Sequence, residues 1–174
     1  MHEGSMGEGA SIMSDPIAKG LLWLFVIFLG ITFGAGIYEE RITVPRWLSS
    51  SEGSGRHWNA DAARRDDTGR RFWAFVTTLP LSLLTLASLI IAWRAPGPLR
   101  GWWLASAVLA LGDRILTFSY FIPTMIRLMR AADSAESVAK AGQWANLNYV
   151  RLTIALAAWL AALKAFSLLY QSHV

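Results

Sequence analysis

Four long apolar stretches alternate with polar segments along the chain. They cover about residues 17–37, 72–93, 101–122 and 148–169. An α-helix rises about 1.5 Å per residue, so roughly 20 residues match a hydrocarbon core roughly 30 Å thick. Backbone groups in lipid must form their hydrogen bonds within the segment, which favours helices over strands. The pattern therefore predicts an all-α fold, an integral membrane bundle of four antiparallel helices.

The segments between these stretches differ greatly in length. Residues 94–100 hold two prolines and a glycine, which predicts a tight turn between the second and third helices. By contrast, 34 residues (38–71) join the first two stretches and 25 residues (123–147) join the last two. Their composition predicts a short interfacial helix within residues 57–71 and a helix on the membrane surface over residues 124–143. Antiparallel helices alternate in direction, so both long loops should close over one membrane face.

The same pattern predicts a single domain with two tails. The four-helix domain should cover residues 17–170. The Gly- and Ser-rich residues 1–16 predict a disordered tail, and residues 171–174 form a second short tail.

Composition supports a membrane protein. Hydrophobic residues make up 54% of the chain and charged residues 16%, against roughly 25% charged residues in soluble domains. The chain has nine Trp, which favour membrane interfaces, and no Cys, which excludes disulfides and thiolate metal sites. We expect a multi-pass protein of the cell membrane. The two long loops hold ten Lys and Arg, against three beside the other face, which predicts cytoplasmic loops.

Charge and motifs narrow the expected partners. The net charge is +4, but the basic residues flank apolar runs, so membrane lipid is a better partner than nucleic acid. An apolar small-molecule substrate is the other expected partner. Gly30 and Gly34 have the spacing of a helix-packing seam, which also allows a homo-oligomer. Neither a nucleotide-binding loop nor a cluster of metal ligands is apparent, so no cofactor and no metal is predicted.

Arg114 lies inside the third stretch, where an unpaired arginine costs at least a few kcal/mol. Its neighbour Asp113 is about 100° round the helix, so the two side chains are not expected to face one another. Helical spacing places Thr117 and Phe121 on the face of Arg114. It likewise places Trp144, Asn148 and Arg151 on one face of the fourth helix, and the loop-side end also carries Tyr38 and Tyr120.

Two interpretations of these polar residues remain open. In the first, Arg114 and Arg151 bind an anion or enolate in one pocket, with Tyr38 and His57 as the other candidate catalytic residues. Side chains at Thr117, Tyr120, Phe121, Trp144 and Asn148 would then bind substrate. In the second, the arginines pair with Asp113, Glu39 or Glu40 and only hold the helices together.

Two motifs and one shorter stretch resemble a known family. The motifs are RILTFSYFIPTMIRL at residues 114–128 and WANLNYVR at residues 144–151, and the stretch runs from Gly34 to Pro45. Together they resemble the anthrone-oxygenase-like family of small four-helix membrane proteins. The matching positions are Tyr38, Pro45, Arg114, Pro123, Thr124, Trp144, Asn148 and Arg151.

The resemblance implies a function, and the chain leaves a second one open. Fungal members of the family are implicated in oxidising anthrones to anthraquinones with molecular oxygen, which implies a cofactor-independent oxygenase for an activated aromatic ring. Alternatively, the chain is a non-enzymatic membrane protein that binds a lipid or small molecule, or is a subunit of a membrane complex.

Overall fold

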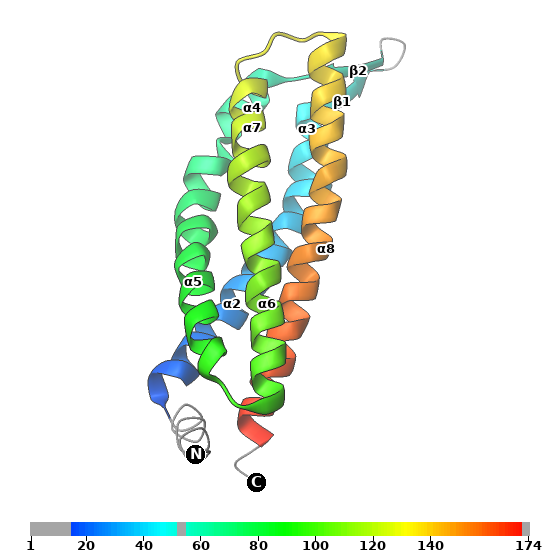
Figure 1. Cartoon of the computed structure of the whole chain (residues 1–174). Helices are drawn as coiled ribbons and strands as arrows, with labels where there is room; N and C mark the ends of the chain where they lie inside the picture. Colours follow the sequence, from blue (N-terminus) through cyan, green and yellow to red (C-terminus); the bar gives the residue numbers. More distant parts are fainter. Residues whose placement is uncertain (1–14, 52–54, 172–174) are drawn as a thin grey trace, which may run out of the picture.

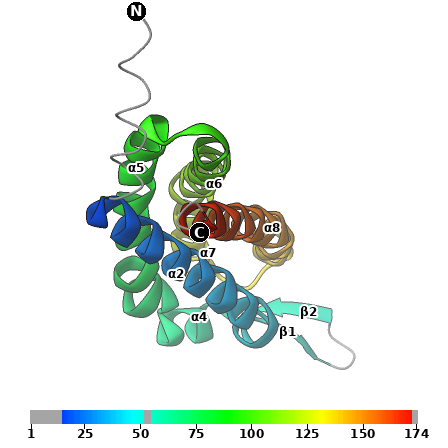
Figure 2. The same ribbon diagram turned by 90° about the horizontal axis from the view of Figure 1, so that it is seen from below.

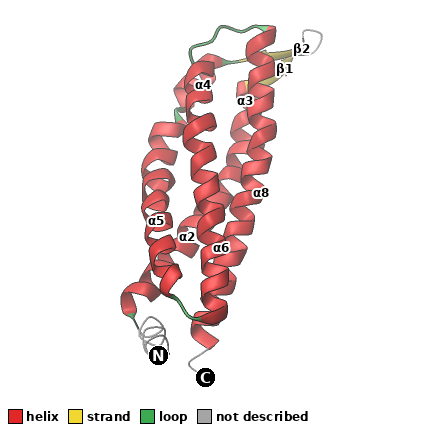
Figure 3. Cartoon of the chain, in the orientation of Figure 1, coloured by secondary structure: helices red, strands yellow, loops and turns green. Residues whose placement is uncertain are grey.

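The computed structural model describes residues 15–51 and 55–171. It is an elongated bundle of four long helices, with a small hairpin and a short helix at one end (Figures 1 and 3). In chain order the elements are α2 (Pro16–Tyr38), η1 (Glu39–Thr43), α3 (Val44–Trp47), β1 (Leu48–Ser51), β2 (Gly55–Trp58), α4 (Ala60–Asp66), η2 (Gly69–Thr78), α5 (Leu79–Arg94), α6 (Gly97–Leu116), η3 (Thr117–Phe121), α7 (Ile122–Leu128) and α8 (Ala135–Gln171).

Several of these elements are continuous, which leaves four rods. The first three elements form one rod over Pro16–Trp47, and η2 and α5 form a second over Gly69–Arg94. The third consists of α6, η3 and α7 over Gly97–Leu128, and α8 by itself is the fourth. Helix α2 packs against α5 and α8, and α6 packs against the same two helices. Seen from the end, α2 and α6 therefore occupy opposite corners of the bundle (Figure 2). The predicted all-α four-helix bundle is confirmed.

Local chemistry explains two of the helix ends. Asp15 caps the first helix by accepting a 2.9 Å hydrogen bond from the backbone N–H of Ile17, and Pro16 occupies the first turn. Pro is well suited there because its missing N–H has no intrahelical partner at that position. The predicted turn between α5 and α6 contains Gly97, whose φ of 43° favours glycine.

The second long connection differs from the prediction. The helices run on past the apolar stretches, so only residues 129–134 link α7 to α8. The segment 124–143, predicted as a helix on the membrane surface, instead belongs mostly to α7 and α8, which pack against one another. Within the first connection a short helix does form, α4. It is preceded by the β1–β2 hairpin, in which Leu48 pairs with Trp58.

The outer surface of the bundle is apolar, and the four rods are long enough to cross a membrane. They have 32, 26, 32 and 37 residues, compared with the roughly 20 needed for a bilayer core. Large side chains such as Leu83, Ile90, Val108 and Leu160 are exposed around it. An apolar surface this extensive marks a membrane-facing protein, so the chain is a multi-pass membrane protein.

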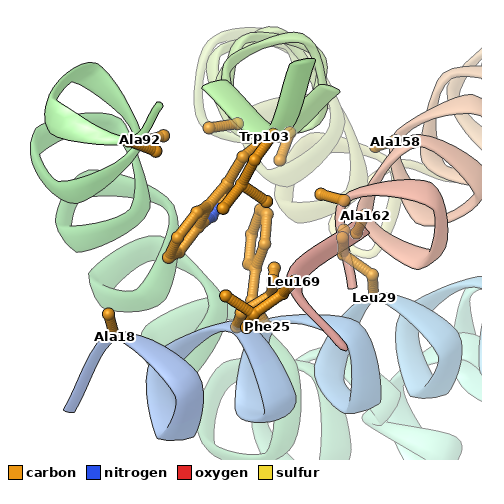
Figure 4. Packing of buried hydrophobic residues seen from close by; sticks show 14 of the residues in the cluster. Ala18, Phe25, Leu29, Ala92, Trp103, Ala158, Ala162 and Leu169 are labelled. Carbon is orange, nitrogen blue, oxygen red and sulfur yellow. The ribbon is translucent and has the colours of Figure 1, made fainter. Parts of the chain in front are cut away.

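Inside, the bundle has an apolar layer at the end that holds both described chain ends. Trp103 and Phe25 point toward one another at its centre, with small residues such as Ala92 and Ala162 beside them (Figure 4). The alanines let the helices approach closely, as helix packing in lipid requires. At the opposite end, a second cluster forms what we call the aromatic cap: Val44, Trp47, Trp58, Ala60, Ala63, Phe121, Leu128, Ala141 and Trp144.

Glycines of the predicted seam take different roles. A Cβ atom on Gly30 would lie 3.1 Å from the Trp159 ring of α8, so this glycine serves packing within the chain. A Cβ atom on Gly34 would have no neighbour within 4 Å among the described residues. At Gly30 the predicted seam is therefore covered by α8 of the same chain, whereas at Gly34 it is open.

Candidate functional site

Buried polar residues lie between the apolar layer and the aromatic cap. On α8, for example, Ala158 belongs to the apolar layer, Asn148 and Arg151 follow toward the loops, and Trp144 belongs to the cap. We call this group the polar layer. Its members are the buried Glu39, Glu40, Asp113, Arg114, Thr117 and Asn148 and the half-buried Arg151.

Three prolines shape the helices at this level. The segments η1, η2 and η3 are π-helical, and each ends two residues before a proline: Pro45, Pro80 and Pro123. A proline lacks the N–H of a helical bond and collides with the carbonyl four residues earlier. The preceding turn accordingly widens to five-residue spacing, which changes the direction of the side chains it carries. In η1 this places two consecutive carboxylates, Glu39 and Glu40, inside the bundle.

Arg114 is 5% exposed and forms an ion pair with Asp113 through Nη2 and Oδ2. The sequence-based expectation that these neighbours do not face one another is wrong, because the long guanidinium side chain folds back to the carboxylate. The pair is not saturated. Among the described residues, neither Nε of Arg114 nor Oδ1 of Asp113 has a hydrogen-bond partner, although both atoms are buried.

Arg151 occupies a different environment from Arg114. Its guanidinium lies over two aromatic rings, 4.7 Å from the centroid of Phe121 and 5.5 Å from that of Trp73. Such contacts stabilise a desolvated cation by about 2 kcal/mol. Arg151 also interacts electrostatically with Asp113 and Glu39 and is repelled by Arg114, so the charges of three helices meet here.

The two glutamates of η1 are held by different partners. Oε1 of Glu39 accepts 2.8 Å hydrogen bonds from the hydroxyl of Thr68 and from the indole N–H of Trp73. Oε2 of Glu40 accepts a 2.6 Å hydrogen bond from the amide of Asn148. Asn148 is completely buried, and its own Oδ1 has no partner among the described residues.

The predicted substrate-binding side chains lie in this layer or beside it. Trp144 donates a 3.2 Å hydrogen bond from Nε1 to the carbonyl of Phe121, and the two rings meet edge to face. Thr117 is buried, and its hydroxyl has no partner within the described chain. Tyr120 packs against Phe121 on the side of the cap. The structure thus brings together Arg114, Arg151, Asn148, Trp144, Phe121 and Thr117.

The other two candidate catalytic residues lie elsewhere. Tyr38 is 62% exposed on the outer face of the bundle. His57 lies in the hairpin, where its Nδ1 is 2.8 Å from Oδ2 of Asp133. The backbone N–H of Trp58 also donates to Asp133, and these two hydrogen bonds lower the pKa of the exposed Asp133 carboxyl below its ordinary value. This contact fastens the hairpin to the short link between α7 and α8.

Two lipid-facing grooves reach the polar layer. One, of about 480 Å³, runs between α5 and α6 and has Arg114 in its wall, beside the exposed Leu86, Ile115 and Phe118. The other, of about 270 Å³, runs between α2 and α8 and has Glu40 in its wall. The helix pairs α5–α6 and α2–α8 form opposite sides of the bundle (Figure 2), and each groove lies along one of these pairs.

Reasoning from the sequence named Glu39, Glu40 and Asp113 only as possible partners of the arginines, and it did not name Trp73. A signal for three of them was present: two consecutive carboxylates end the first apolar stretch, and a third precedes the intramembrane arginine. Buried charges need partners, so five charged residues at one level indicate a single network. The role of Trp73 had no such signal, because its indole N–H reaches Glu39 only through tertiary packing.

No group of three or more His, Cys, Asp or Glu side chains in the described part of the chain is arranged to hold a metal ion. Comparison of the chain with protein-family models, with curated proteins and with solved structures found no match. The resemblance to the anthrone-oxygenase-like family therefore rests on the motifs of the chain itself.

Proposed function

We propose that the protein resides in the cell membrane and binds a flat, apolar ring with an acidic C–H group, which it oxidises with molecular oxygen without a cofactor. One observation carries the proposal. Arg114 is buried in the wall of a groove that opens toward lipid, and its Nε has no partner in the described chain. An unpaired guanidinium donor at this depth is costly unless a ligand uses it.

The groove between α5 and α6 suits such a substrate. Its volume of about 480 Å³ falls within the roughly 300–1,000 Å³ of ordinary ligand sites. Leu86, Ile115 and Phe118 supply apolar contacts, and Arg114 supplies a positive charge at the inner end. An apolar ring dissolved in the bilayer would enter from the side and place the oxygen of its enolate beside Arg114.

The ion pair offers a chemical route. Asp113 does not line the groove but is paired with Arg114, which does; through its unpartnered Oδ1 it would take a proton from the ring CH₂, and Arg114 would stabilise the enolate that forms. The carbanion would then reduce oxygen. One ring CH₂ and one O₂ give one C=O and one water: the carbon loses four electrons, oxygen gains four, and both ring protons leave in the water. Arg151, whose guanidinium lies over the Phe121 ring, would stabilise the negative charge of the enolate electrostatically.

Oxygen uptake by the full chain in nanodiscs tests this proposal. With anthrone and a chelator, and without added flavin, haem or nicotinamide, we expect one oxygen consumed for each ring oxidised. Arg114→Gln should lower the rate about a hundredfold, as loss of an oxyanion donor does. Arg94→Gln, which changes an exposed arginine at the end of α5, is the matched control. Uptake that requires iron, copper or flavin would contradict the cofactor-free step.

Folding must be separated from chemistry in this experiment. Asp113→Asn keeps the shape of the side chain but removes both the base and the charge partner of Arg114, so it should abolish uptake. Unchanged circular dichroism shows that the variant is still folded. Leu86→Trp fills the groove without touching the ion pair and should raise KM more than it lowers kcat. Absence of uptake across a panel of activated rings would contradict an oxygenase.

A second candidate is a non-enzymatic binder or a subunit of a membrane complex. The hydrogen bonds that Thr68 and Trp73 donate to Glu39 favour this candidate. In a polar network that only holds helices together, each buried polar group needs such a partner. A ring compound that co-purifies with the protein, or binds in the groove without oxygen uptake, would support this candidate over the oxygenase.

Orientation forms part of the proposal. The excess of Lys and Arg in the loop-side segments favours a cytoplasmic position for the aromatic cap and an external position for both chain ends. Tags at the two ends, tested for protease access in sealed vesicles, should behave alike. Protection of one tag and cleavage of the other would contradict a bundle with four spans.

A further inference from the structure

We propose a second ligand site on the opposite flank of the bundle. The groove between α2 and α8 binds a neutral phenolic ring with an apolar tail, and the ring hydroxyl donates a hydrogen bond to Glu40. This site is separate from the groove at Arg114 and does not depend on the oxidation proposed there.

The first argument is the state of the Glu40 carboxylate. Glu40 is 6% exposed, yet it lines a groove of about 270 Å³ on the outer flank. Asn148 donates to Oε2, whereas no residue of the described chain donates to Oε1. A buried carboxylate is stabilised by two or more donors, so one acceptor position at the inner end of this groove is open to a ligand.

The second argument is the charge balance around Glu40. Arg41 and Arg151 attract this carboxylate electrostatically, and Glu39 repels it. Glu40 therefore already has charged neighbours of both signs. A cationic head group would meet the two arginines, so the fitting ligand is a neutral hydrogen-bond donor.

The third argument is the composition of the walls. Phe33, Ile37, Leu152 and Leu156 present apolar surface, and Arg41 and Tyr149 line the same groove. Thr153 contributes little polarity, because its hydroxyl donates to the carbonyl of Tyr149 at 2.9 Å. A ligand with one donor and an otherwise apolar, flat body matches these walls, and its tail can remain in the surrounding lipid.

Photolabelling of the full chain in nanodiscs tests the site. The probe is a 4-alkylphenol with a diazirine on the tail next to the ring, and its partner is the O-methyl ether with the same tail. The phenol should label residues of the α2–α8 groove about tenfold more than the ether does, since a hydrogen bond to a charged acceptor is lost in the ether. Equal labelling by the two probes would overturn the proposal.

Two variants locate the site. Leu156→Trp fills the groove without altering Glu40 and should reduce labelling about tenfold, whereas Leu160→Trp, one turn further along α8 on the exposed surface, should leave it unchanged. Glu40→Leu should make the phenol and the ether label equally. If Glu40→Leu does not fold, two results still test the proposal. They are the ratio of phenol labelling to ether labelling on the natural chain, and the loss of labelling in Leu156→Trp.

Competition identifies the class of head group. Unlabelled alkylphenol should displace the probe, and an alkylamine with the same tail should displace it at least tenfold less well. Better displacement by the amine would show a site for cations and would overturn the proposed class. The phenol probe lacks an acidic CH₂, so failure here says nothing about oxidation at Arg114.

Discussion

Nδ2 of Asn148 donates a 2.6 Å hydrogen bond to Oε2 of Glu40, across 108 positions of the chain. It joins α8 to η1, the π-helical segment of the first rod. Both side chains are buried, so the bond lies where water cannot replace it. It sets the axial position of α8 against η1 and thereby the height at which Arg151 meets the polar layer.

Replacing Asn148 by Leu should lower the free energy of unfolding by about 1–3 kcal/mol, because the buried carboxylate of Glu40 loses its donor. Unfolding by SDS in mixed micelles, followed by circular dichroism, measures the change. Asn146→Leu, at an exposed position of the same helix, is the control and should change stability by less than about 0.5 kcal/mol. Equal losses would show that the amide bond contributes nothing specific.

Trp73→Phe should also destabilise the fold, by about 1–3 kcal/mol, because it keeps an aromatic ring under Arg151 but removes the N–H that binds Glu39. The same SDS titration applies. Trp102→Phe, at an exposed position on α6, is the matched substitution and should be nearly neutral. A neutral Trp73→Phe would mean that Thr68 alone satisfies the carboxylate.

The two seam glycines should respond differently to leucine. At Gly30 a side chain would press on the Trp159 ring, so Gly30→Leu should cost about 1–3 kcal/mol through overpacking. At Gly34 the space is open, and Gly34→Leu should not lower stability, since leucine also has the better helix propensity. Thermal unfolding in detergent compares the two variants directly. A destabilising Gly34→Leu would indicate that a second chain covers this face.

Acid should loosen the hairpin. The hydrogen bonds from Trp58 and His57 lower the pKa of Asp133 below its ordinary value of 3.8, which favours the charged carboxylate in the fastened state. The contribution is therefore complete above pH 3.8 and is lost as the pH falls below it, through the lowered pKa. Hydrogen exchange at the Trp58 amide should accelerate at acid pH, relative to its intrinsic rate. Asp133→Asn should remove this dependence, and Asp61→Asn should not.

The positions of the four spans followed from sequence alone. All four predicted stretches lie within the four rods, because lipid forces each apolar segment to satisfy its own backbone hydrogen bonds. The turn around Gly97 could also be predicted from sequence, because two prolines and a glycine end a helix without any tertiary contact. The lengths of the four rods could not be predicted from the apolar pattern. Beyond the apolar stretches, α7 and α8 continue as helices that pack on one another, and the apolar pattern does not record that contact.

The arrangement of the polar layer depended on tertiary structure. Helical spacing correctly placed Asn148, Arg151 and Trp144 on one face of α8. It failed for Arg114, whose long side chain turns back onto Asp113. It gave no direction for Glu39 and Glu40, which the π-helical η1 places inside together. A periodic sequence pattern gives the direction of side chains only in a regular helix. The surrounding tertiary structure decides where side chains of a π-helical turn point and which groups a flexible arginine contacts.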